Sequence, residues 1–133
     1  MFLHLLTPDQ QQTFFRAAGL LVHSDSVLAQ AEIDLVEAAQ VEANIDAVPS
    51  PASSTAELHE ELRAMRGTPS ARALLVELAG LAVVDGASSE ERVMLTEIAA
   101  SAGVGEEDLD RIVDVAARAL SAQRDATALV AGG

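Results

Sequence analysis

Signals for the start and end of a helix recur along this chain and constrain its fold more than any other feature. A serine or threonine followed three residues later by Glu or Gln forms a capping box, which marks a helix N-terminus. Proline suits the first helical turn, and glycine suits the position just after the last one. Apolar residues recur at helical spacing between these signals. The boxes are Thr7 with Gln10, Ser54 with Glu57, and Ser88 with Glu91. The predicted helices are 8–24, 29–44, 55–66, 69–84, 89–102 and 106–121.

Two segments fall outside these helices. Residues 47–54 are rich in proline and serine, which predicts a linker because proline interrupts a helix. Residues 122–133 end in two glycines, and we expect this tail to fray. The helix at 69–84 is apolar on nearly every side, so we expect it to be central and buried. We expect Gly19 and Gly80 to permit close contact between helices.

The apolar side chains indicate the same fold class. They are mainly Ala, Leu and Val, and the aromatic residues are three Phe with no Trp or Tyr. A core of small and medium aliphatic side chains favours closely packed helices over a β-sandwich. A chain of 133 residues suits one domain with its own core. We therefore predict an all-α fold, a single-domain bundle of about six helices that spans residues 1–133.

The charge balance excludes some partners and favours others. The chain has 21 acidic residues against 8 arginines, a formal net charge of −13. Such a surface repels phosphate, so we expect no nucleic-acid binding, but it attracts cations and basic protein partners. The absence of cysteine excludes disulfides and thiolate chemistry. The longest apolar stretch, 73–84, is shorter than the about 20 residues of a membrane span. With no signal-peptide pattern at the start, we expect a cytoplasmic protein without direct membrane insertion.

Residues 18–35 and 79–95 resemble each other. In each, an apolar helix containing Ala-Gly-Leu leads to an aspartate, a short turn follows, and a glutamate lies in the first turn of the next helix. The repeat predicts an internal duplication, with two helix pairs related by pseudo-twofold symmetry. The aspartates are Asp25 and Asp85, and the glutamates are Glu32 and Glu91.

The surroundings of the second copy resemble the tellurite-resistance TerB-like family. The resemblance lies in an Ala/Leu-rich helix ending at 85–86, an acidic capping segment at 88–92, the helix at 94–99 and the link at 103–109. The opening, 1–15, is similar to short stand-alone members. The resemblance implies an all-α bundle with internal duplication and a link to bacterial resistance to tellurite and other chemical stress. Related domains precede J-domains in membrane-anchored co-chaperones, which implies a protein partner, including a membrane-associated one.

The resemblance also implies a divalent-metal site at acidic residues near the inter-helix turns. The matching positions are Asp25, Glu32, Asp85 and Glu91. Ca²⁺ and Mg²⁺ take several oxygen ligands, and twofold-related helix pairs could bring four carboxylates together; Mn²⁺ and Zn²⁺ are further candidates. The alternative is that the four are ordinary turn and first-turn residues without a ligand. An EF-hand is excluded by the spacing.

No set of catalytic groups is expected. His4, His23 and His59 are scattered, without the paired spacing of a zinc site. The neighbours His23, Ser24 and Asp25 cannot form a catalytic triad, because adjacent residues at a helix end point in different directions. No glycine-rich phosphate loop occurs. The polar run at 57–63 predicts a solvated helix face, and docking of a partner is the alternative.

The sequence therefore predicts a non-enzymatic TerB-like interaction or stress-response domain that binds a divalent cation at its two turns. The alternative is a metal-free acidic scaffold or adaptor for a basic or membrane-protein partner. A carboxylate-based metal hydrolase is the least favoured hypothesis, because such enzymes usually gather more ligands in one pocket.

Overall fold

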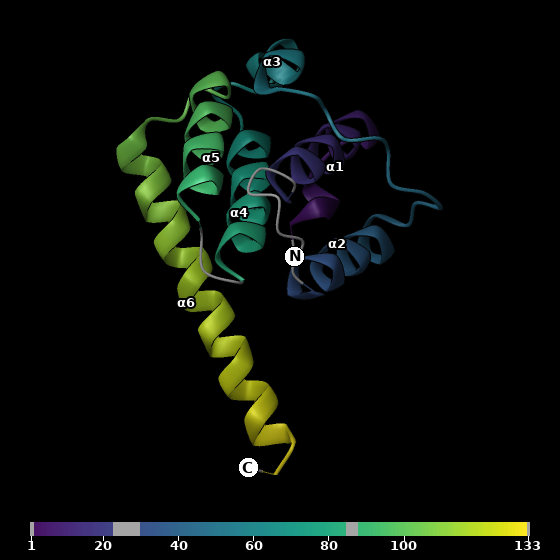
Figure 1. Cartoon of the computed structure of the whole chain (residues 1–133), viewed down its shortest axis with the longest axis vertical. Helices are drawn as coiled ribbons and strands as arrows, with labels where there is room; N and C mark the ends of the chain where they lie inside the picture. The colour runs from purple at the N-terminus through teal and green to yellow at the C-terminus, as the bar shows by residue number, and fades with distance from the viewer. Residues whose placement is uncertain (1, 23–29, 85–87, 133) are drawn as a thin grey trace.

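The computed structural model describes residues 2–22, 30–84 and 88–132, and these described residues are all in helices, turns and loops, without a strand. The all-α prediction is confirmed (Figure 1). A short 3-10 helix precedes six α-helices. They are η1 (Leu3–Leu5), α1 (Pro8–Val22), α2 (Gln30–Ala43), α3 (Thr55–Arg63), α4 (Pro69–Val83), α5 (Ser89–Ser101) and α6 (Glu106–Val130).

Helix α4 lies at the centre of the bundle, as its apolar sequence predicts. It packs against α1, α5, α6 and η1 (Figure 1). Leu74, Leu75 and Leu78 on α4 are completely buried. They belong to one hydrophobic core that extends from Leu3 to Ala116. Since no aromatic residue lies on α4, close packing of Ala and Leu builds this centre.

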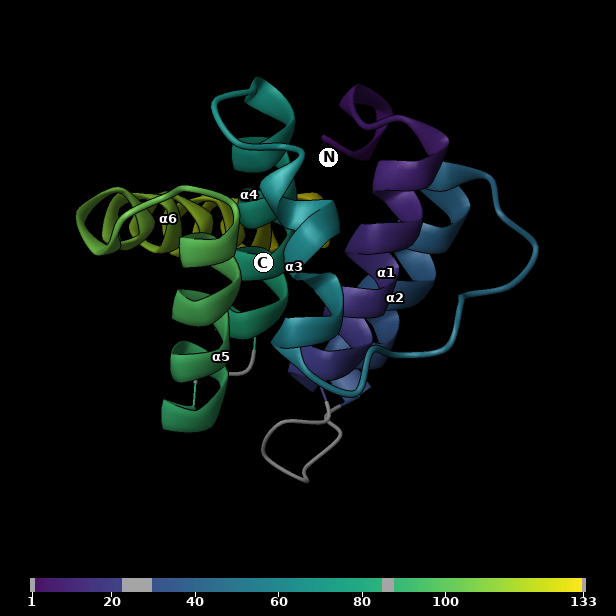
Figure 2. The ribbon, with the colours of Figure 1, turned by 90° about the horizontal axis from the view of Figure 1, so that it is seen from above.

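The two helix pairs predicted from the repeat are both present. The first pair is α1 with α2, and the second is α4 with α5; the two members of each pair pack together. The first helices of the pairs, α1 and α4, also pack against each other (Figures 1 and 2). The pseudo-twofold symmetry between the pairs stays a prediction.

Helix α3 connects the two pairs instead of presenting only a solvated polar face. Leu58 and Leu62 on one side of α3 are completely buried. Its polar side chains contact α1 on one flank and α5 on the other, and Figure 2 shows α3 between these helices. The contacts are Arg16 Nη1 to Glu61 Oε1 (2.8 Å), Thr55 Oγ1 to Glu97 Oε2 (3.1 Å) and His59 Nδ1 to Ser101 Oγ (3.1 Å).

The linker 47–54 has no helix or strand, in agreement with its composition, and it lies against α1. The N–H of Ala52 donates to the carbonyl of Arg16 (3.2 Å). A Cβ atom built on Gly19 would lie 2.8 Å from Cβ of Pro51. The expectation that Gly19 admits a neighbouring helix is therefore wrong, because Gly19 admits the linker. The same expectation is wrong for Gly80, whose added Cβ would meet no described atom within 4 Å.

Helix α6 is longer than predicted. We expected residues 122–133 to fray, but the helix continues to Val130 and projects from the bundle (Figure 1). Ala, Leu, Gln and Arg dominate this stretch and have high helix propensities. Arg124 Nη2 also donates to the carbonyl of Val84 at the end of α4 (2.9 Å). Among the described helices, α6 included, none has the length and apolar character of a membrane span.

Candidate functional site

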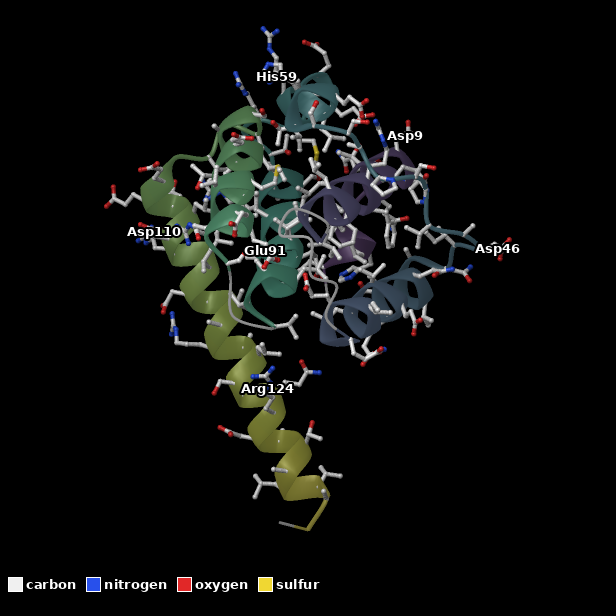
Figure 3. All side chains as sticks on the ribbon, viewed as in Figure 1. Asp9, Asp46, His59, Glu91, Asp110 and Arg124 are labelled. Atoms are coloured by element: carbon white, nitrogen blue, oxygen red, sulfur yellow. The ribbon has the colours of Figure 1, made fainter. Side chains whose placement is uncertain are left out.

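Two buried glutamates occupy equivalent places in the two helix pairs. Glu32 lies in the first turn of α2, and Glu91 lies in the first turn of α5, as the repeat predicts. Their exposed fractions are 2% and 3%, and no other charged side chain within the described ranges is buried. Figure 3 shows Glu91 inside the bundle, whereas Asp9 and Asp46 lie at the periphery. The structure thus distinguishes these two carboxylates from the other described acidic side chains.

The capping box at Ser88 explains how Glu91 is positioned. Ser88 Oγ accepts the N–H of Glu91 (3.1 Å), and the N–H of Ser88 donates to Glu91 Oε1 (3.3 Å). The box therefore turns the carboxylate back over the start of α5, where the helix dipole favours negative charge. The box of Thr7 with Gln10 is also confirmed, with bonds of 2.9 and 3.2 Å.

The capping box predicted at Ser54 is wrong. Ser54 is the N-cap of α3, but its side chain makes no capping bond. The carboxylate of Glu57 instead accepts the N–H of Ser53 (2.8 Å). The Glu57 carboxylate thus reaches one residue beyond the N-cap, so the reciprocal pair of bonds does not form.

Ser88 makes a capping bond and Ser54 does not, so alanine variants of these two N-cap serines form a matched pair. We expect Ser88→Ala to lower the free energy of unfolding by about 1 kcal/mol, because the N–H of Glu91 loses its acceptor. We expect Ser54→Ala to lower it by less than about 0.3 kcal/mol, because no capping bond is lost there. Urea unfolding followed by circular dichroism measures both. Equal losses in the two variants would contradict the assignment of the capping bond.

Burial makes Glu32 and Glu91 chemically distinctive. A carboxylate removed from water costs free energy unless hydrogen bonds, a positive charge or a metal ion compensates for the lost hydration. Such groups can take up a proton or supply oxygen ligands to a hard cation. Two of them at equivalent positions give the fold two sites where either chemistry is possible.

The structure tests only part of the four-residue metal site. Asp25 and Asp85 lie outside the described residues, as do the neighbours His23 and Ser24. Within the described ranges, no three His, Asp or Glu side chains gather closely enough to hold a metal ion. His4 and His59 are both exposed on the surface. The four-carboxylate cluster therefore stays a prediction, and its two described members are buried.

Sequence reasoning missed a groove that α1, α2 and the linker enclose. Its volume is about 280 Å³. Most of its lining is apolar, and its charged members are Glu32 and Glu37. The lining residues are Phe15, Gly19, Val22, Glu32, Ile33, Val36, Glu37, Gln40, Val48, Pro49 and Pro51. The apolar residues inside the linker were the one signal for this groove, because a solvated connection does not need Val48 or two prolines.

We compared the chain with protein-family models, with curated proteins and with solved structures, and none of them matches it. The resemblance to the TerB-like family therefore depends on the sequence motifs.

Proposed function

We propose that this chain is a non-enzymatic, TerB-like interaction domain of a bacterial stress response that acts in the cytoplasm. In this proposal a divalent cation binds at the two inter-helix turns, through Asp25 and Glu32 in the first pair and Asp85 and Glu91 in the second. The observation that carries it is the burial of Glu32 and Glu91, at 2% and 3% exposure, in equivalent first turns.

A physical argument connects this burial to a cation. A first-turn glutamate usually stays in water, where it interacts with the helix dipole at little cost. Glu57 and Glu106 occupy such first-turn positions and are exposed. Moving the carboxylate into the protein adds a desolvation cost, which a bound cation would offset. Two such placements in two related turns support a shared role for these residues.

We expect Ca²⁺, Mg²⁺, Mn²⁺ or Zn²⁺ to raise the thermal stability of the protein. A cation at 100 times its Kd should add about 2.7 kcal/mol, because it binds the folded state and not the unfolded one. Thermal unfolding is measured for each cation after removal of bound metal with a chelator. The double variant Asp25→Ala/Asp85→Ala should lose the increase, and Glu32→Gln or Glu91→Gln should reduce it.

The control for this experiment removes the same charge from the periphery. Asp9 and Asp46 are exposed (Figure 3), so Asp9→Asn/Asp46→Asn should respond to the cation like the unmodified protein. If no cation stabilises the protein, or if the two double variants respond equally, the cation-binding part of the proposal fails.

The second candidate function is a metal-free acidic adaptor for a basic or membrane-protein partner. The apolar groove beside Glu37 favours it, because groove and charge together suit a protein ligand. In this function the partner binds equally well with and without divalent cations. The comparison of binding in chelator and in added cation separates the two candidates.

A further inference from the structure

We propose that the groove between α1, α2 and the linker binds a short peptide segment of a partner protein, in which an apolar anchor side chain lies next to an arginine or lysine. This inference rests on the proposed role as an interaction domain. It does not depend on a bound cation.

The size and shape of the groove suit the anchor of a peptide. Its volume of about 280 Å³ lies at the lower limit of the about 300–1,000 Å³ of typical small-molecule pockets. Ile33, Val36 and Gln40 form one stripe along α2, which rises about 10 Å at about 1.5 Å per residue. Such a stripe contacts about two turns of a helix or a short extended segment. The groove therefore suits one or two apolar side chains of a longer ligand.

The charge of the groove determines which type of side chain is expected next to the apolar anchor of the peptide. Glu37 lines the groove and is exposed, and it makes no hydrogen bond or ion pair with any residue that the structure describes. Glu32 lies further along the same helix, and no arginine is among the lining residues. The chain as a whole carries a net charge of −13. A cationic side chain is complementary to this surface, whereas an acidic one is repelled.

The linker forms a wall that exists before the ligand binds. Two contacts hold it: Pro51 packs on Gly19, and the N–H of Ala52 donates to the carbonyl of Arg16. Just before the linker, Gln40 Nε2 donates to the carbonyls of Ile45 (3.3 Å) and Asp46 (3.0 Å), which fixes the approach to it. Val48 lies in the same wall and is 38% exposed. A preformed wall reduces the entropy that binding costs, so even a small groove can bind a peptide.

The test uses labelled peptides and fluorescence anisotropy in a buffer that contains a chelator. The probe is an amphipathic peptide of about 12 residues made of Leu, Ala and Arg, a length that covers the stripe. Two matched peptides replace Arg by Glu or Leu by Ser. We expect the Leu/Arg peptide to bind and each replacement to weaken binding at least about tenfold, because both the anchor and the cation are required.

Variants of the protein locate the binding site. Glu37→Gln should weaken binding about 2–5-fold, as expected for an exposed ion pair. Val36→Arg should weaken it more than about tenfold, because it fills and charges the groove. Glu60→Gln is the matched control, since it removes the same charge from an exposed position on α3. It should leave the Kd within about 1.5-fold. Circular dichroism verifies that each variant is folded, and only folded variants are compared.

Three results would overturn the proposal: no binding of the Leu/Arg peptide at millimolar concentration, equal binding of the Leu→Ser peptide, or equal losses in Glu37→Gln and Glu60→Gln. Sedimentation in the absence of peptide tests whether a second copy of this chain occupies the groove. If the chain self-associates and Val36→Arg abolishes the self-association, the occupant is a second copy and not the proposed peptide. Because the buffer contains no free divalent cation, failure of cation binding leaves this result unchanged. Peptide failure with successful cation binding removes only the groove proposal.

Discussion

Replacement of Leu78 by alanine is expected to lower the free energy of unfolding by about 3–5 kcal/mol. Leu78 is completely buried on α4, the helix that packs against α1, α5 and α6. The loss combines the transfer energy of the removed methyl groups with the cost of the cavity that remains, because the surrounding helices cannot fully close it. Domains of this kind are stable by about 5–15 kcal/mol, so the variant loses a large share of its stability.

Urea unfolding measures this loss. Circular dichroism is the suitable signal because the chain has no Trp or Tyr. Val130→Ala is the control, since Val130 is 90% exposed and should change stability by less than about 0.5 kcal/mol. A loss below about 1 kcal/mol in Leu78→Ala would show that α4 is not at the centre of the core.

The second large effect concerns two glycines at the same place in the repeat. Gly19 lies between Ala18 and Leu20, and Gly80 lies between Ala79 and Leu81. We expect Gly19→Ala to lower the free energy of unfolding by about 1–2 kcal/mol. The new methyl group would lie 2.8 Å from Cβ and 2.9 Å from Cγ of Pro51, and the rigid proline ring must move. Overpacking of this kind costs about 1–3 kcal/mol, which exceeds the gain in helix propensity.

The opposite sign is expected for Gly80→Ala. An added Cβ there meets nothing within 4 Å among the described atoms, so alanine brings only its better helix propensity. The free energy of unfolding should rise by about 0.5–1 kcal/mol. Thermal and urea unfolding of both variants give the comparison. The same sign in both variants would contradict the contact between the linker and α1.

Local chemistry made most of the helices predictable. Capping residues and prolines locate where α1, α4 and α5 begin. Gly67 and Gly103, both with positive φ, lie shortly after the ends of α3 and α5. These signals are readable because they act within a few residues. The errors arose where the outcome depends on conformation or on distant contacts. The spacing of Ser54 and Glu57 is that of a capping box, yet the Glu57 carboxylate binds one residue earlier. Similarly, α6 continues past residue 121 because its residues have high helix propensity and because Arg124 binds the carbonyl of Val84. No capping residue or proline marks this continuation in the sequence.

The candidate site was predictable in position but not in burial. The repeat locates Glu32 and Glu91 in first turns, where the structure has them. Nothing in the pattern separates these glutamates from the exposed Glu57 and Glu106, because burial depends on the packing of other helices around them. The groove was missed for the same reason. It requires residue 19 to meet residue 51, a contact between distant parts of the chain.

The continuation of α6 makes it a rigid spacer. Beyond Arg124, the described residues of the helix are all exposed, and in Figure 1 this stretch points away from the bundle. From Arg124 to Val130 a helix rises about 9 Å at about 1.5 Å per residue. A label or a fused module attached after Val130 is consequently held apart from the packed helices and in a defined direction.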